Sequence, residues 1–155
     1  MSVSKPCHVS YIRTETGEPL THTPKISLAA VYRLENTDEN LMVVNTHAIN
    51  FVKTRVFLSQ MSDLEKMIAT HTGPVIFAGD FNTWNKKRNI IVAGTIIRLG
   101  MEKTYFNPDT RTKRFRYPLD HIFYKGLELK NSSVAGSLFS SDHKALEAEF
   151  CLPDH

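Results

Sequence analysis

The sequence predicts an α/β (α+β) fold in which a mixed, mostly antiparallel β-sheet is flanked by helices. Three observations lead to this prediction. Several short segments rich in apolar and β-branched residues are bounded by turn residues, one segment carries a helical apolar period, and an uninterrupted apolar run follows it. After an extended entry segment the order reads β-β-α-β-α-β-β-β, which is typical of a mixed sheet with helices on one side.

Length and composition fit one globular domain. The chain has 155 residues, of which 41% are apolar, so it can bury a substantial core. We expect a single domain over 1–155, with an entry segment over about 1–25 and a core over 26–152. The formal net charge is only +3, which argues against a broad nucleic-acid-binding surface but leaves a local phosphate site open.

The two cysteines and the apolar runs limit the environment of the protein. Cys7 and Cys151 lie near opposite ends of the sequence without a metal-binding pattern, so we predict free thiols and no zinc site. No apolar run approaches the ~20 residues of a membrane span, and no signal-peptide pattern opens the sequence. We therefore expect no membrane span and a cytoplasmic protein.

The entry segment and the first strands are separated by turn residues. Proline, glycine and threonine in 1–25 favour a short strand over 9–13 and a hairpin near Gly17. Apolar residues over 26–34 and 41–46 flank a polar turn and predict two antiparallel strands.

The next segments predict a helix that leads into a central strand. Within 51–72, apolar residues are spaced by four, three and four positions, and Gly73-Pro74 ends the pattern. The apolar run over 74–78 then predicts a strand covered on both faces, which delivers Gly79-Asp80 to its carboxyl end.

The last third of the chain predicts one helix and three strands. The segment 89–99 is a helix candidate, although its β-branched residues also favour a strand. A loop over 104–118 precedes strands over 119–124, 128–134 and 144–150.

Four short polar motifs lie at the ends of these strands. They are Asn-Thr-His at 45–47, Gly-Asp-Phe-Asn at 79–82, Leu-Asp-His-Ile-Phe at 119–123 and Ser-Asp-His at 141–143. Polar groups at strand ends converge at one edge of a sheet, where open α/β sheets bind ligands. Carboxylates bind hard divalent cations, and imidazoles stabilise charge or transfer protons near neutral pH.

These four motifs, in this order, resemble the endonuclease/exonuclease/phosphatase superfamily, which includes deoxyribonuclease I and exonuclease III. The resemblance extends from about residue 27 to 150, and the segments 42–51 and 78–84 are similar to a bacterial YafD-like branch. It implies a metal-dependent phosphoester hydrolase, most readily a phosphodiesterase or nuclease, which uses Mg²⁺ or Mn²⁺ and an activated water for in-line attack on phosphorus.

The resemblance also implies roles for individual residues. Asp80 would orient the attacking water as a base or metal ligand, Asn82 would hold water and phosphate, and His143 would bind and polarise the phosphate. Asp120 would orient an imidazole, that of His143 first of all. The remaining implied residues are Asp142 for the metal, with Asp80 and Asn82, His47 as the second imidazole, and Asn45, Trp84, Arg114 and Arg116 for the substrate.

Several of these residues also have a structural interpretation. Trp84 would either line the substrate cleft or pack beneath its loop. The loop that contains Arg114 and Arg116 would either grip a nucleic acid backbone or phosphorylated headgroup, or be simply solvated. His121 follows Asp120 and points to the opposite face of its strand, so we expect a structural role for it.

One feature of the superfamily has no counterpart in the sequence. Its members carry an upstream Gln-Glu whose glutamate binds the metal, and Glu15, Glu18 and Glu35 lack that context. The chain thus corresponds to the C-terminal half of a four-layer α/β/β/α sandwich, with an uncovered apolar sheet face that predicts a homodimer. The alternative to an enzyme is a non-catalytic half-domain that binds phosphate, metal or a partner protein.

Overall fold

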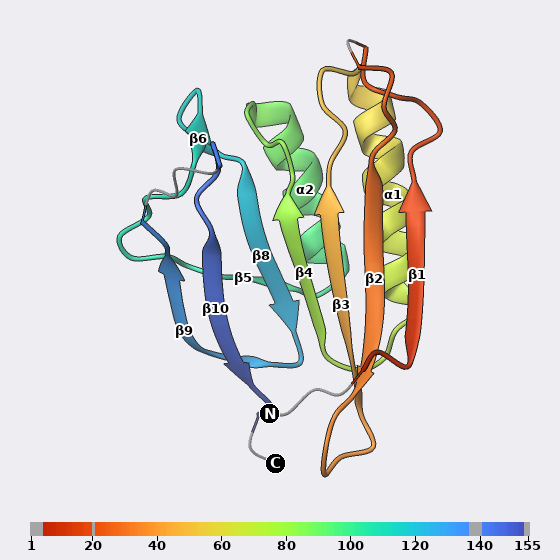
Figure 1. Ribbon diagram of the computed structural model, residues 1–155, viewed down its shortest axis with the longest axis vertical. Helices are drawn as coiled ribbons and strands as arrows, with labels where there is room; N and C mark the ends of the chain where they lie inside the picture. The colour runs from red at the N-terminus through yellow and green to blue at the C-terminus, as the bar shows by residue number, and fades with distance from the viewer. Residues whose placement is uncertain (1–4, 20, 137–140, 154–155) are drawn as a thin grey trace.

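The computed structural model describes residues 5–19, 21–136 and 141–153. A six-stranded sheet of order β1-β2-β3-β4-β8-β5 forms its centre (Figure 1). β3 and β4 are parallel and all the other neighbours are antiparallel. The strands of this sheet are β1 (His8–Arg13), β2 (Ile26–Arg33), β3 (Asn40–His47), β4 (Val75–Asp80), β5 (Glu102–Lys103) and β8 (Asp120–Lys125).

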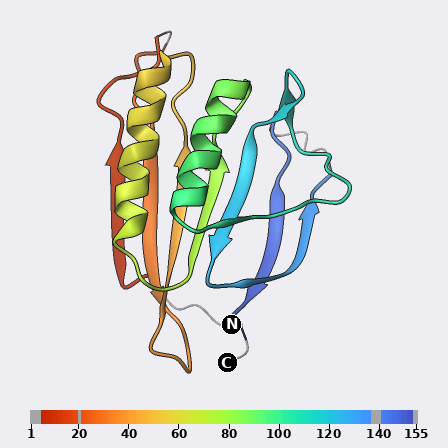
Figure 2. The same ribbon diagram turned by 180° about the vertical axis from the view of Figure 1, so that it is seen from behind.

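Two helices and two small ribbons complete the structure. The helices α1 (Thr54–Ala69) and α2 (Lys86–Arg98) lie on the same face of the sheet (Figure 2). β9 (Glu128–Val134) pairs with β10 (Leu146–Cys151), and β6 (Lys113–Arg114) pairs with β7 (Tyr117–Pro118). The predicted fold class, a mixed and mostly antiparallel sheet with helices, is confirmed.

Two local predictions need correction. The second helix begins at Lys86 instead of Asn89, because the side chain of Asn85 accepts a hydrogen bond from the amide of Arg88 and caps the helix. The predicted loop over 104–118 contains the β6–β7 hairpin, whose turn residues are Phe115 and Arg116.

The main core lies between the helices and the sheet. The predicted apolar stripe of α1 is fully buried, with no exposed surface on Phe57, Met61, Leu64 or Ile68. Burying one such side chain contributes about 1.5–3 kcal/mol, so this stripe fixes α1 against the sheet. Phe77 of β4 packs in the same core.

The opposite face of the sheet is covered only in part. Near β8 the ring of Tyr124 packs against Phe150 of β10, with 4.9 Å between ring centroids. Over β1 and β2 large apolar side chains are exposed by between 47% and 69%; they are Val9, Tyr11, Ile26 and Leu28. The expected uncovered apolar face therefore lies on these two strands.

Both cysteines, Cys7 and Cys151, are free, as predicted. Among the described residues, neither helix combines the length and the apolar content that a bilayer crossing requires.

Candidate active site

The strand register brings three of the predicted residues side by side. His47 at the end of β3 pairs in parallel with Asp80 at the end of β4. Asp80 in turn pairs in antiparallel register with Asp120, the first residue of β8. Neighbouring strands lie about 4.8 Å apart, so an imidazole and two carboxylates meet at one edge of the sheet.

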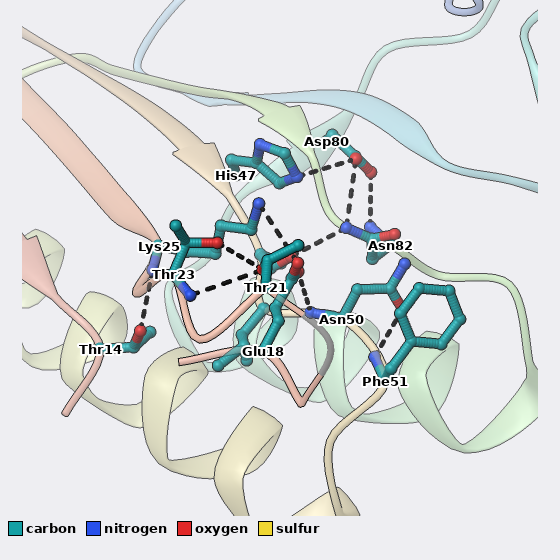
Figure 3. A network of polar contacts seen from close by, with 12 residues as sticks. Thr14, Glu18, Thr21, Thr23, Lys25, His47, Asn50, Phe51, Asp80 and Asn82 are labelled. Carbon is teal, nitrogen blue, oxygen red and sulfur yellow. Dashed lines mark hydrogen bonds and ion pairs between the residues drawn. The ribbon is translucent and has the colours of Figure 1, made fainter. Parts of the chain in front are cut away.

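Asp80 is held by the residue two positions further on. Its Oδ1 accepts a hydrogen bond from the amide of Asn82 at 2.7 Å, and its Oδ2 accepts one from Asn82 Nδ2 at 3.1 Å (Figure 3). Asn82 has a φ of 48°, a left-handed conformation that asparagine tolerates better than most residues. The Nε2 of His47 lies 3.6 Å from Asp80 Oδ2, and the His47 side chain is 53% exposed. The pair thus presents an accessible imidazole beside a fixed carboxylate.

A second pair joins β8 to the segment before β10. The Nδ1 of His143 lies 2.7 Å from Asp120 Oδ2, so the expected hydrogen bond between these residues is present. Burial raises the pKa of Asp120, which His143 opposes through its hydrogen bond and charge. Burial alone would lower the pKa of His143, but the hydrogen bond to Asp120 and the charges of Asp120, Asp80 and Asp142 outweigh it and raise this pKa. The charged form of His143 is therefore more favoured than in an isolated histidine, which suits an anion-binding group.

Both pairs line one open cleft of about 770 Å³. Seven of the predicted site residues line it: His47, Asp80, Asn82, Arg114, Asp120, Asp142 and His143. The other three predicted residues, Asn45, Trp84 and Arg116, lie outside this lining.

The three residues outside the lining have other surroundings. Asn45 is an exposed residue of β3, two positions before His47 and therefore on the same face of the sheet. Trp84 donates from Nε1 to Asn50 Oδ1 at 2.8 Å, so its indole is tied to the loop after β3. Arg116 is exposed at the turn between β6 and β7.

Glu18 is a cleft residue to which the sequence analysis assigned no role. Its Oε1 accepts a hydrogen bond from the amide of Asn50 at 2.9 Å, and its Oε2 lies 3.5 Å from Nζ of Lys25. Both Glu18 and Lys25 line the cleft, and Figure 3 shows them facing His47 and Asn82. Glu18 lacks the upstream family motif, but the entry segment folds back and brings it to the cleft without that motif.

Arg88 is a second residue without a sequence signal, since an arginine in the first turn of a helix is usually solvated. It is only 4% exposed, and its Nη1 donates to the carbonyls of Ile49 at 2.9 Å and Asn82 at 3.3 Å. Its guanidinium carbon lies 4.3 Å from the ring centroid of Phe57. Burial lowers the pKa of Arg88 to about 10, against the opposing charges of Asp80 and Glu18. Arg88 thus joins the loops after β3 and β4 beneath the cleft.

His121 has the structural position that was expected. The His121 side chain is buried. Its Nδ1 accepts a hydrogen bond from Nη1 of Arg111 at 3.3 Å, and its Nε2 lies 2.8 Å from the hydroxyl oxygen of Thr83. Thr83 in turn donates to the carbonyl of Pro118 at 2.6 Å. If Nε2 of His121 carries the proton and donates to the Thr83 hydroxyl, every group in this series of hydrogen bonds has a partner. Burial lowers the pKa of His121 to about 3, so this imidazole is neutral at ordinary pH.

The cleft supplies the oxygen donors that a hard divalent cation takes, but not a closed set of ligands. Four carboxylates line it, those of Glu18, Asp80, Asp120 and Asp142. Within residues 5–19, 21–136 and 141–153, no three His, Cys, Asp or Glu side chains gather closely enough to hold a metal ion. The described residues by themselves therefore do not fit a complete Mg²⁺ site.

The sequence is similar to a group of curated bacterial proteins. It is 43% identical over 139 residues to a UPF0294 protein of Vibrio parahaemolyticus, which covers 88% of this chain and 49% of that protein. A UPF0294 protein of Yersinia enterocolitica is 41% identical over 134 residues, which are 86% of this chain and 51% of that protein. The chain thus spans about half the length of the curated relatives it matches, and the expected YafD-like group is confirmed.

The fold is shared with solved structures of low sequence identity. An endonuclease/exonuclease/phosphatase from Bacteroides vulgatus superposes with a TM-score of 0.73 at 17% identity, covering 96% of this chain and 66% of that one. The model of the Endonuclease/Exonuclease/phosphatase family matches residues 6–143, which include every motif of the cleft. The chain therefore belongs to the endonuclease/exonuclease/phosphatase family.

Proposed function

We propose that this chain provides the catalytic face of a phosphodiesterase or nuclease that depends on Mg²⁺ or Mn²⁺. Family membership supports phosphoester hydrolysis in general. The observation that carries the finer proposal is the pair of carboxylate–imidazole contacts, His47 with Asp80 and His143 with Asp120, on one open cleft.

The two pairs would have different tasks in an in-line displacement. His143, held by Asp120, binds a non-bridging phosphate oxygen and neutralises the charge that builds up on it. Asp80 orients a water and accepts its proton as the water oxygen bonds to phosphorus, while the bond to the leaving oxygen breaks. His47, exposed beside Asp80, either stabilises the negative charge of the phosphate, with the leaving oxygen taking its proton from solvent water, or itself donates a proton to the leaving oxygen.

Nucleic acid is the proposed substrate class. A solved structure of zebrafish TDP2 in complex with a single-stranded DNA product has a TM-score of 0.65 to this chain, at 16% identity, covering 95% of this chain and 68% of that one. In this chain Lys25, Lys113 and Arg114 line the cleft, so cations are available to a phosphate backbone.

The candidate ligands of the divalent cation are the carboxylate oxygens of Asp80 and Asp142 and the side-chain amide oxygen of Asn82. When bound, it would supply charge neutralisation at the phosphate. Because the described residues do not close a metal site, the longer relatives would need ligands from the half that this chain does not match.

Titration of Mg²⁺ and Mn²⁺ by calorimetry, with hydrolysis of bis-p-nitrophenyl phosphate, DNA and RNA in the same samples, tests the proposal. Any turnover that the chain shows should fall by at least about a hundredfold in Asp80→Ala and stay unchanged in Asp38→Ala, at an exposed turn. Turnover that is equal in the two variants would contradict the role of Asp80.

The alternative is a non-catalytic half-domain that binds phosphate, metal or a partner protein, and the open metal site favours it. Phosphate binding that His143→Ala abolishes, without turnover on any substrate, would support this alternative.

Two further predictions about the protein's state can be tested separately. Self-association through the exposed face of β1 and β2 predicts a dimer in sedimentation, and a monomer at high concentration would contradict it. The cytoplasmic location also stays a prediction.

A further inference from the structure

Two exposed aromatic side chains from distant segments flank an arginine at the rim of the cleft. Phe51, in the loop after β3, is 53% exposed, and Phe115, at the tip of the β6–β7 hairpin, is 69% exposed. The guanidinium carbon of Arg114 lies 6.0 Å from the ring centroid of Phe51 and 5.8 Å from that of Phe115. It is therefore within cation–π range of both rings.

The hairpin tip has a sequence that does not suit its backbone. Arg114 pairs with Tyr117, which leaves two turn residues, Phe115 with a φ of 48° and Arg116 with a φ of 71°. A two-residue turn with positive φ at both positions strongly prefers Asn-Gly, and a bulky residue in this conformation is an outlier. Residues in such rare backbone conformations cluster at ligand-binding sites. The presence of a phenylalanine at position 115 is therefore better explained by a contact of its ring with a ligand than by the needs of the turn.

Phe51 is held in a similar way, with a φ of 54°. The Oδ1 of Asn50 accepts hydrogen bonds from the amide of Phe51 at 2.9 Å and from the indole of Trp84 at 2.8 Å. The amide of Asn50 donates to Glu18. The Trp84 ring also meets Phe115 edge to face, with 6.4 Å between centroids. Contacts from the entry segment and from the loop after β4 thus order the rim before any ligand arrives.

We propose that Phe51, Arg114 and Phe115 form a stacking site for a planar aromatic ring joined to the bound phosphate, as in a nucleotide. The proposal rests on the proposed function, because Phe51 and Arg114 line the same cleft as the two carboxylate–imidazole pairs. The cleft volume of about 770 Å³ lies within the range of small-molecule sites, roughly 300–1,000 Å³. Stacking of a base on an aromatic side chain corresponds to binding that is about 5- to 150-fold tighter.

Binding of AMP compared with ribose 5-phosphate isolates the ring, because both ligands carry the same phosphate and sugar. Affinities are measured on the whole chain by calorimetry and by the fluorescence of Trp84, its single tryptophan. We expect AMP to bind at least about fivefold more tightly. Phe51→Asn and Phe115→Asn should each reduce this ratio while preserving the affinity for ribose 5-phosphate, and the double variant should bring the ratio to about one.

Asparagine is chosen because it tolerates the left-handed backbone of both positions, so the variants should melt no lower than the parent. Tyr105→Asn is the matched control, since Tyr105 is 79% exposed and lies outside the cleft lining. It should leave the ratio unchanged.

The outcomes separate this proposal from the proposed function. Equal binding of AMP and ribose 5-phosphate by the parent would overturn the stacking site, whereas hydrolysis of bis-p-nitrophenyl phosphate would still support the enzyme. An AMP preference that depends on both phenylalanines, without hydrolysis, would support the ring site and count against the enzyme. Phenyl phosphate compared with methyl phosphate then shows whether any aryl ring suffices or a nucleobase is required.

Discussion

Gly79, the residue before Asp80, should be intolerant of even one added methyl group. It pairs with Thr46 across the parallel strands β3 and β4 and has a φ of +134°, which side-chain-bearing residues rarely adopt. A Cβ at this position would lie 2.0 Å from the carbonyl oxygen of Thr46 and 2.9 Å from Oδ1 of Asn45. Relief of the first contact requires backbone to move, because Thr46 presents a carbonyl and not a flexible side chain.

The expected loss for Gly79→Ala combines two costs. The strained backbone contributes about 1–3 kcal/mol and overpacking about another 1–3 kcal/mol. The free energy of unfolding should therefore fall by about 2–6 kcal/mol, a large share of the ~5–15 kcal/mol that typical domains possess. The Thr46–Gly79 pair is next to the His47–Asp80 pair in β3 and β4, so the same backbone movement would separate His47 from Asp80. The phosphate binding that we propose for this cleft should therefore fall as well.

Urea unfolding followed by circular dichroism at pH 7 measures this loss. Gly94→Ala is the matched control, because Gly94 lies within α2 and an added Cβ there would meet only the flexible end of Arg98, at 3.1 Å. Alanine is favoured over glycine in a helix by about 1 kcal/mol, so the control should gain stability. A loss of less than about 1 kcal/mol for Gly79→Ala would refute the steric argument.

Three further substitutions test the hydrogen-bond networks around the cleft. Burial lowers the pKa of His121 to about 3, so the folded protein binds the proton of this imidazole more weakly than the unfolded chain does. The stability that the neutral imidazole contributes is complete above the ordinary histidine pKa of about 6.5. It is lost as the pH falls towards 3, by up to about 1.4 kcal/mol per pH unit. Urea unfolding between pH 7 and 4 should show this slope, and His121→Gln should flatten it; an equal slope in both proteins would contradict the assignment. Asp120→Asn should lower the pKa of His143, measured by NMR titration of its ring protons, and an unchanged pKa would mean that the pair does not form in solution. Arg88→Met keeps an apolar contact with Phe57 but leaves two carbonyls without their donor, so thermal unfolding should show a loss of about 1–3 kcal/mol; a stabilised variant would mean that relief of the buried charge outweighs both hydrogen bonds.

The sequence predicted the sheet and most of the cleft because both depend on local patterns. The apolar period of α1 and the apolar run of β4 each occupy one segment, and the observed bounds follow them closely. The motifs that contain His47, Asp80 and Asp120 each sit at a strand end, so the strand register alone brings them together.

The parts that sequence reasoning missed depend on contacts between distant segments. In the cleft, Glu18 is held by contacts with Lys25 and with Asn50, which lies 32 positions later in the sequence. Arg88 is buried because the loops after β3 and β4 cover it. No local sequence pattern predicts this burial. The β6–β7 turn was missed because Phe115 and Arg116 are not turn-forming residues.

The spread of the cleft residues along the chain has a consequence for synthesis. The cleft lining runs from Glu18 to His143, and β8 must pair with β4 before Asp120 meets Asp80. A ribosome adds roughly 5–20 residues per second, so the first and last of these residues emerge about ten seconds apart. Until His143 has left the ribosome, the growing chain contains the His47–Asp80 pair but not the His143–Asp120 pair. The complete cleft can therefore form only after the last of its residues has been synthesised.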